Sequence, residues 1–513
     1  MSHTADTARP AAKMPPQIPY IIGNEGCERF SFYGMRNILT VFLMTSLLMS
    51  VPEELRKAEA KEVFHTFVIG VYFFPLLGGW LSDRFFGKYN TILWLSLVYC
   101  AGHACLAIFE SSIQGFYFGL FLISLGSGGI KPLVSAFVGD QFDKSNRSLA
   151  QKVYDAFYWI INFGSFFASL LMPVVLKAFG ASVAFGLPGL LMLTATVIFW
   201  SGRKKYVHQP ARGANPHNFL KVVWTALKGG PLGLGVAALG VLGAAYSLSR
   251  MGDLGFVAAA CLALVLVMAF GGVGAALQLE RARGVHPDEA VDGVRAVLRV
   301  LVLFALVTPF WSLFDQKAST WVLQADQMAK PEWFQSSMMQ ALNPALVLIL
   351  IPFNNLVLYP ALQRMGLKVT ALRRMGAGIA LSGLAWIVAG VLQLWLDEGS
   401  TVSIVWQMLP YALLTLGEVL VSATGLEFAY SQAPLSMKGT IMSFWNLSVT
   451  VGNLWVLLSN VSVKSPAAMG AIHASGFSET ACLMFFFAGF ALVAALLFGL
   501  AARRYPLQDN YRG

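Results

Sequence analysis

The stretch LALVLVMAFGGVGAAL, residues 262–277, contains no charged or polar side chain over sixteen positions. A helix that crosses the hydrocarbon core of a bilayer needs about 20 mostly apolar residues, and apolar neighbours extend this stretch to that length. Similar runs recur along the chain, for example TFVIGVYFFPLLGGWL at 66–81 and FFFAGFALVAALLFGL at 485–500. The repetition predicts a membrane protein built from spanning helices.

The composition supports the same class. The chain has 513 residues, of which 57% are hydrophobic and 12% charged, whereas soluble domains carry roughly 25% charged residues. The alternating ten-residue pattern of an outer-membrane barrel does not occur. We therefore expect an all-α polytopic membrane protein. About fourteen apolar blocks are long enough to span, at roughly 20–48, 63–82, 90–109, 115–138, 153–176, 183–201, 219–248, 254–279, 296–325, 336–361, 372–396, 402–430, 438–461 and 478–502.

The formal net charge of +10 comes from basic residues in alternate loops. That distribution follows the positive-inside rule, which predicts that both termini are cytoplasmic and removes the need for a nucleic-acid partner. The five cysteines lie in apolar runs without a C-x-x-C spacing, so we expect neither a metal site nor a cofactor. The loop basic residues are Arg84 and Lys88; Lys144, Arg147 and Lys152; Arg203, Lys204 and Lys205; Arg281 and Arg283; Arg364, Lys368, Arg373 and Arg374; Arg503 and Arg504.

The spans divide into six, two and six. We expect an N-terminal six-helix bundle over 1–205, a linker with a two-helix hairpin over 206–290, and a C-terminal six-helix bundle over 291–513. The loop GGWLSDRFFGKYN at 78–90 resembles the loop pattern of the major facilitator superfamily. That resemblance implies two related bundles with a substrate site between them at mid-membrane.

Several ionisable side chains lie inside the predicted spans, where each costs at least ~2.5 kcal/mol at the bilayer centre on insertion scales. In GNEGCERFSFYGMRNIL, residues 23–39, helical periodicity puts Glu25, Arg29 and Arg36 on one face. Since the set comes from both halves, we expect its members to meet where the halves meet. Its members are Glu25, Glu28, Arg29, Arg36, His65, Lys131, Asp315, Lys317, Glu418 and Glu427.

Three motifs carry a family resemblance. EGCERFSFYG at 25–34, GSGGIKPLVSAFVGDQF at 126–142 and FYWIINFGS at 157–165 resemble the motifs of the proton-coupled oligopeptide transporter family, bacterial type. FWSLFDQKASTW at 310–321 resembles that family's aromatic–acidic segment. The resemblance covers essentially the whole chain. It implies a symporter in the bacterial inner membrane that imports di- and tripeptides with protons and works as a monomer.

The resemblance also implies residue roles. Arg36 and Lys131 are expected near the peptide carboxylate, and Glu418 near its amino group. Proton coupling is expected to involve Glu25, Glu28, Arg29, Asp315 and His65. The remaining pocket residues are expected to be Tyr33, Tyr72, Tyr158, Asn162, Trp311, Asn343, Ser422 and Trp445.

The chemistry of the residues is consistent with these roles. A short peptide is a zwitterion, so its pocket needs opposite charges several ångströms apart and walls that tolerate varied side chains. We expect Lys131 and Glu418 to pair across the cavity in the absence of peptide. Phe32 and Lys317 stand where many family members have Tyr and Gln, and Lys317 leaves the partner of Asp315 open.

Other functions fit the sequence less well. A carrier of nitrate or of peptide-like drugs could use the same fold, but the intact E-x-x-E-R run favours peptide and proton. An enzyme is not expected, because no H-E-x-x-H, G-x-S-x-G or paired-Asp protease motif occurs within a span. A receptor or channel is disfavoured by the lack of a soluble domain and by charges shared between the halves.

Overall fold

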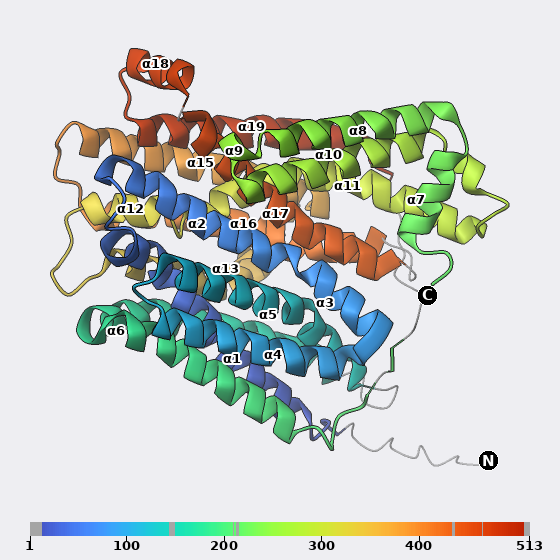
Figure 1. Ribbon diagram of the computed structural model, residues 1–513, viewed down its shortest axis with the longest axis horizontal. Helices are drawn as coiled ribbons and strands as arrows, with labels where there is room; N and C mark the ends of the chain where they lie inside the picture. Colours follow the sequence, from blue (N-terminus) through green and yellow to red (C-terminus); the bar gives the residue numbers. More distant parts are fainter. Residues whose placement is uncertain are drawn as a thin grey trace.

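The computed structural model describes residues 13–142, 149–208, 210–211, 215–432, 437–463 and 465–506. Over these residues the chain is a bundle of long helices (Figure 1). The basic loop residues Lys144 and Arg147 lie outside the described part of the chain, and so does the side chain of Lys152.

The first half contains the helices α1 to α6. A single-turn π-helical segment, Leu43–Leu47, extends α1, and a second, Ser82–Phe86, precedes α4. The bounds are α1 Ile18–Phe42, α2 Glu53–Phe73, α3 Pro75–Leu81, α4 Gly87–Ile108, α5 Ile113–Asp140 and α6 Ala150–Ser201.

The hairpin and the second half complete the chain. The hairpin comprises α7 Phe219–Lys228, α8 Pro231–Ser249, α9 Met251–Leu254 and α10 Phe256–Leu277. The second half comprises α11 Asp288–Gln316, α12 Thr320–Gln327, α13 Leu342–Phe353, α14 Tyr359–Arg364, α15 Ala371–Asp397, α16 Met408–Gln432, α17 Lys438–Val463, α18 Pro466–Ser475 and α19 Glu479–Arg504.

Among the described residues, 11 segments are long and apolar enough to cross a membrane. Two of these segments each contain two expected spans, because the chain turns at Gly87 and Gly180, whose φ angles of 70° and 82° suit glycine. The charged α1 adds a further span. The expected succession of fourteen spans is thereby recovered.

Two expected helices are interrupted. The block at 219–248 is not one span, because Gly229, Gly230 and Pro231 separate the short α7 from α8. The block at 296–325 ends as α11 at Gln316 and resumes as α12 at Thr320. Both predictions of a continuous helix were wrong. A run of apolar residues indicates a buried segment, but it does not show where a change in a few backbone angles ends one helix and begins the next.

Apolar side chains form separate cores in the two halves. One core runs from Ile18 to Tyr206 and takes in Ala318 from the second half. The second half contributes a core that includes Val291 and Phe498 and another that includes Trp321 and Trp386. Each half therefore packs chiefly on itself.

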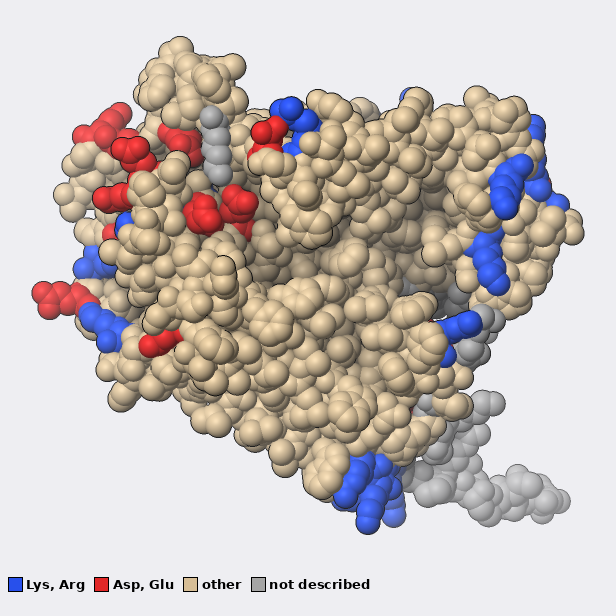
Figure 2. Space-filling view, viewed as in Figure 1, with Lys and Arg blue, Asp and Glu red and all other residues tan. Residues whose placement is uncertain are grey.

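Charged side chains separate along the long axis. In Figure 2 the visible acidic residues gather toward one end of the molecule, and basic residues dominate the end where the chain termini lie in Figure 1. Polar contacts join α1 to the second half: Thr40 Oγ1 donates to the Ala318 carbonyl, between α11 and α12, at 2.8 Å, and Gln340 Nε2, just before α13, donates to the Asn37 carbonyl at 3.0 Å.

Candidate functional site

The first helix carries a buried triad of charges. Arg29 Nε lies 2.6 Å from Glu25 Oε1 and 2.9 Å from Glu28 Oε2. The i, i+4 spacing on α1 places Glu25 and Arg29 on one face, so the helix itself brings this pair together. Ser127 Oγ of α5 donates to Glu28 Oε1 at 3.5 Å. The predicted polar stripe of α1 is thus a compact cluster inside the first half.

Arg36, two turns further along α1, reaches the other half of the molecule. Its Nη2 lies 2.6 Å from Asp315 Oδ1 of α11, and both side chains are buried. Asp315 Oδ2 also accepts a hydrogen bond from Asn453 Nδ2 at 2.8 Å. The partner of Asp315, which the sequence left open, is Arg36.

His65 joins the same network from α2. Its Nδ1 lies 2.5 Å from Asn453 Oδ1, and its Nε2 lies 3.0 Å from Ser319 Oγ. Asn453 therefore connects His65 to Asp315. The sequence analysis did not identify Asn453, although an amide within the apolar run of α17, which also contains Asn446 and Asn460, is the same kind of signal that identified the buried charges.

Lys131 of α5 has aromatic neighbours instead of the predicted carboxylate. Its Nζ lies 3.8 Å from the ring centroid of Phe32 and 5.0 Å from that of Tyr72. Ring faces attract a cation at these distances. No ion pair joins Lys131 to Glu418 within the described ranges, so the predicted pairing is wrong for this conformation.

Glu418 of α16 is instead linked to Lys317 through an amide. Asn343 Nδ2 donates to Glu418 Oε2 at 2.5 Å, and Asn343 Oδ1 accepts from Lys317 Nζ at 2.9 Å. The Asn343 amide also donates to Thr415 Oγ1 at 3.0 Å. Asn343, predicted as a pocket residue, connects the cation of Lys317, directly after the end of α11, to the carboxylate of Glu418 on α16.

Aromatic rings border this group of charges. Trp311 and Trp445 meet edge to face with ring centroids 5.8 Å apart, and both are almost fully buried. Gly452 permits the close approach of α17 to α11, because a Cβ there would lie 2.6 Å from Trp311 Cβ and 2.8 Å from the Thr308 carbonyl oxygen. Tyr33 is half-buried beside Phe32, with ring centroids 5.4 Å apart.

The remaining predicted residues lie around the network. Asn162 of α6 donates to the backbone carbonyl of Tyr158 at 2.9 Å, and the Tyr158 side chain is 41% exposed. Ser422 is half-buried one turn beyond Glu418 on α16. The side chain of Glu427 lies outside the described residues.

We call the buried charged side chains described above the charged path, and it contains as many basic groups as acidic groups. The members are Arg29, Arg36, Lys131 and Lys317 on the basic side and Glu25, Glu28, Asp315 and Glu418 on the acidic side. Such a site can bind a molecule with one positive and one negative end by replacing internal contacts. It can also bind a proton by neutralising one carboxylate.

Comparison with known proteins identifies the family. The model described as the POT family matches residues 89–474. Solute carrier family 15 member 2 of Rattus norvegicus is 34% identical over 396 residues, which are 74% of this chain and 49% of that protein. Peptide transporter 3 of Caenorhabditis elegans is 34% identical over 413 residues, 75% of this chain and 51% of that protein. The chain thus spans about half the length of these curated relatives.

Solved structures cover nearly the whole chain. The crystal structure of the POT family transporter PepTSo shares 71% identity and a TM-score of 0.95, covering 97% of this chain and 100% of that one. The crystal structure of an auto-inhibited POT family peptide transporter shares 64% identity and a TM-score of 0.94, and the match covers 97% of this chain and 99% of that one. The predicted fold, two six-helix bundles with an inserted hairpin, is confirmed.

Proposed function

This chain belongs to the POT family, and we propose that it is a proton-coupled symporter. It imports di- and tripeptides by alternating access. The observation that carries the proposal is the buried Arg36–Asp315 pair between the halves, together with Lys131 of the first half and Glu418 of the second, neither of which is in a direct ion pair within the described residues. These groups supply both signs of charge to a zwitterion.

Each end of a peptide has a suitable partner. The carboxylate of the peptide binds Lys131 and Arg36. Within the described residues Lys131 has no carboxylate at ion-pair distance, whereas Arg36 is paired with Asp315. The amino group binds Glu418, which exchanges the Asn343 amide for the peptide ammonium. The rings of Trp311, Trp445 and the tyrosines provide walls that accept different side chains.

Proton coupling acts through the carboxylates. A proton on Asp315 removes the charge that holds Arg36 and weakens the link between the halves. That change frees Arg36 for the peptide carboxylate. The triad of Glu25, Glu28 and Arg29 is the second site of proton coupling. Protonation of either glutamate leaves Arg29 with only the other glutamate as a charged partner. His65 participates through Asn453.

The cellular setting forms part of the proposal. We place the protein in the bacterial inner membrane as a monomer with both termini cytoplasmic. The basic side chains at the end that carries the termini support this orientation. We assign residues 1–205 and 291–513 to the two moving bundles and 206–290 to the linker.

Uptake by proteoliposomes tests the function. Labelled dialanine should accumulate when the outside is made acidic and should stop accumulating when a protonophore is added. Nitrate supplied under the same gradient should neither accumulate nor compete. Accumulation of dialanine that ignores the proton gradient would refute the coupling, and uptake of nitrate alone would refute the substrate.

A further inference from the structure

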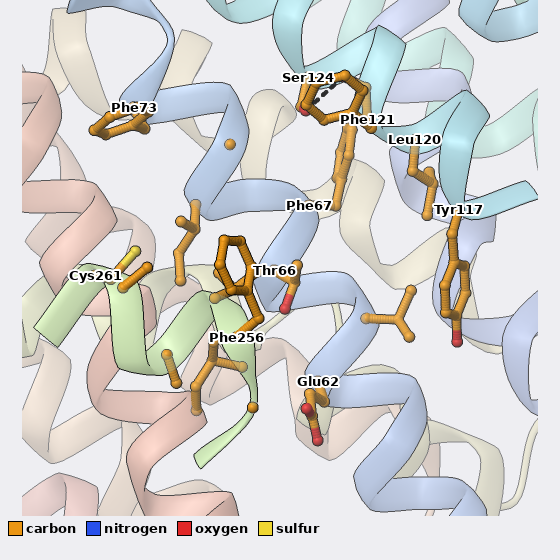
Figure 3. Close-up of a pocket in the computed structure, with 18 of the residues that line it drawn as sticks. Glu62, Thr66, Phe67, Phe73, Tyr117, Leu120, Phe121, Ser124, Phe256 and Cys261 are labelled. Carbon is orange, nitrogen blue, oxygen red and sulfur yellow. Dashed lines mark hydrogen bonds between the residues drawn. The ribbon is translucent and has the colours of Figure 1, made fainter. Parts of the chain in front are cut away.

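A cavity of about 660 Å³ lies outside the charged path, between α2, α5 and the start of α10. Figure 3 shows its walls, with Phe67 and Phe73 from α2, Phe121 from α5, and Phe256 and Cys261 from α10. None of the eight charges described above lines it. The inserted hairpin therefore encloses a separate apolar space against the first bundle.

One end of the cavity is polar. Glu59 and Glu62 of α2 line it there, and the hydroxyl of Tyr117 lies toward the same end as Glu62 (Figure 3). The Tyr117 hydroxyl is buried and has no hydrogen-bond partner among the described residues. Two carboxylates and a phenol thus face a space whose other walls are apolar except for Thr66 and Ser124.

The dimensions match one leaflet of a membrane. From Glu59 to Phe73, α2 rises about 21 Å at 1.5 Å per residue. Half of a bilayer's hydrocarbon core is about 15 Å thick. The lining helices α2, α5 and α10 belong to segments that are apolar enough to span, so we expect the cavity to lie at the depth of the bilayer, where its occupant would be a lipid.

We propose that this cavity binds a phospholipid with an amine head group, such as phosphatidylethanolamine. One acyl chain lies along Phe67, Phe73 and Phe121, and the ammonium lies against Glu59 and Glu62. The Tyr117 hydroxyl donates to an oxygen of the phosphate or the glycerol ester. An anionic phospholipid fits the apolar wall equally well but meets two carboxylates of its own sign, so the polar end selects the amine head group.

The first experiment tests the head group. The full-length protein in detergent is incubated with equal amounts of phosphatidylethanolamine and phosphatidylglycerol of the same acyl chains, and bound lipid is counted by native mass spectrometry. The parent should retain phosphatidylethanolamine. The double variant Glu59→Gln/Glu62→Gln should lose the preference by roughly tenfold, as expected when charge-assisted hydrogen bonds are removed.

A matched control removes two acids from the same helix. Glu53 and Glu54 are exposed at the start of α2 and do not line the cavity, so Glu53→Gln/Glu54→Gln should keep the preference of the parent. Equal binding of both lipids by the parent, or preference for phosphatidylglycerol, would overturn the proposed head group.

The second experiment tests the location. Ala260 lines the cavity, whereas Ala238 is exposed on α8 away from it. Ala260→Phe should reduce the retained lipid several-fold, and Ala238→Phe should leave it unchanged. Val257→Trp fills the cavity from the same helix if Ala260→Phe does not fold. Unchanged lipid binding in a folded cavity-filling variant would overturn the site.

Discussion

Arg36 and Asp315 stand 279 positions apart in the chain, and their side chains meet at 2.6 Å between Nη2 and Oδ1. The contact joins α1 of the first bundle to α11 of the second. Both side chains are buried, so each needs the other to compensate its charge. The pair is therefore both a link between the bundles and a point where a proton or a peptide can act.

Removal of one partner of this pair should be costly. Arg36→Met or Asp315→Leu should each reduce stability by roughly 3–5 kcal/mol, because the remaining charge is left buried without a partner. The double variant should be more stable than either single variant, yet it should not transport. Melting temperatures of the four detergent-purified proteins measure the coupling.

The exposed pair Arg250–Asp253 serves as the control for that cycle. Its side chains are 55% and 61% exposed, and removing both should change stability by only about 0–1 kcal/mol. Additive losses at Arg36 and Asp315 would contradict a direct link between the bundles.

The triad of α1 should control gradient-driven uptake. Glu25→Gln and Glu28→Gln should each abolish accumulation of dialanine under an inward proton gradient while keeping some exchange of peptide for peptide. The exchange remains because the peptide contacts at Lys131 and Glu418 are unchanged. Glu54→Gln, an exposed acid of α2, is the control. Accumulation by both triad variants at the parental level would show that the triad does not couple protons.

Glu418 should determine the preference for a free amino group. In the parent, dialanine should compete for uptake far better than its N-acetylated form. In Glu418→Gln, binding of dialanine should weaken by roughly tenfold or more, as for a lost charge-assisted hydrogen bond, and the two competitors should become similar. Glu398→Gln, exposed after α15, should keep the parental ratio. Strong competition by the acetylated peptide against the parent would remove Glu418 from this role.

A histidine contact at the base of the hairpin should make stability depend on pH. His286 Nδ1 lies 2.9 Å from His217 Nδ1, and burial, with the nearby His217 and Lys221, lowers the pKa of His286. An unfolded histidine titrates near 6.5. Below that pH the unfolded chain binds the proton more readily than the folded chain, so stability should fall as the pH falls through about 6.5.

Thermal melts of detergent-purified protein between pH 8 and pH 5 measure this effect. His286→Gln should flatten the decline, whereas His473→Gln, an exposed histidine of α18, should leave the decline as in the parent. A parental decline that persists unchanged in His286→Gln would assign the pH dependence to other groups.

Helical periodicity explains which site features could be predicted from sequence. The contact of Glu25 with Arg29 follows from their spacing on one helix, and the structure confirms it. The expectation that buried charges from both halves meet is borne out by Arg36 and Asp315. These predictions needed only local geometry and the cost of a charge in a membrane.

The partners across the interface could not be predicted in the same way. Lys131 was expected to meet Glu418 but lies over Phe32 and Tyr72, and Asn343 occupies the contact with Glu418. Which groups meet depends on the relative placement of two bundles, and the sequence pattern of each helix contains no such information. The roles of the site residues in transport stay predictions.

The cargo of the proposed cycle determines how much charge crosses the membrane, because the four basic and four acidic groups stay with the protein and return to their starting positions in each cycle. A zwitterionic peptide carries no net charge. Each proton carried with the peptide therefore moves one elementary charge across the bilayer, which amounts to about 2.3 kcal/mol at 100 mV. A potassium diffusion potential, negative inside and imposed with valinomycin, should accelerate peptide uptake even when the pH is equal on both sides. A cycle indifferent to that potential would require a compensating charge to travel with each peptide.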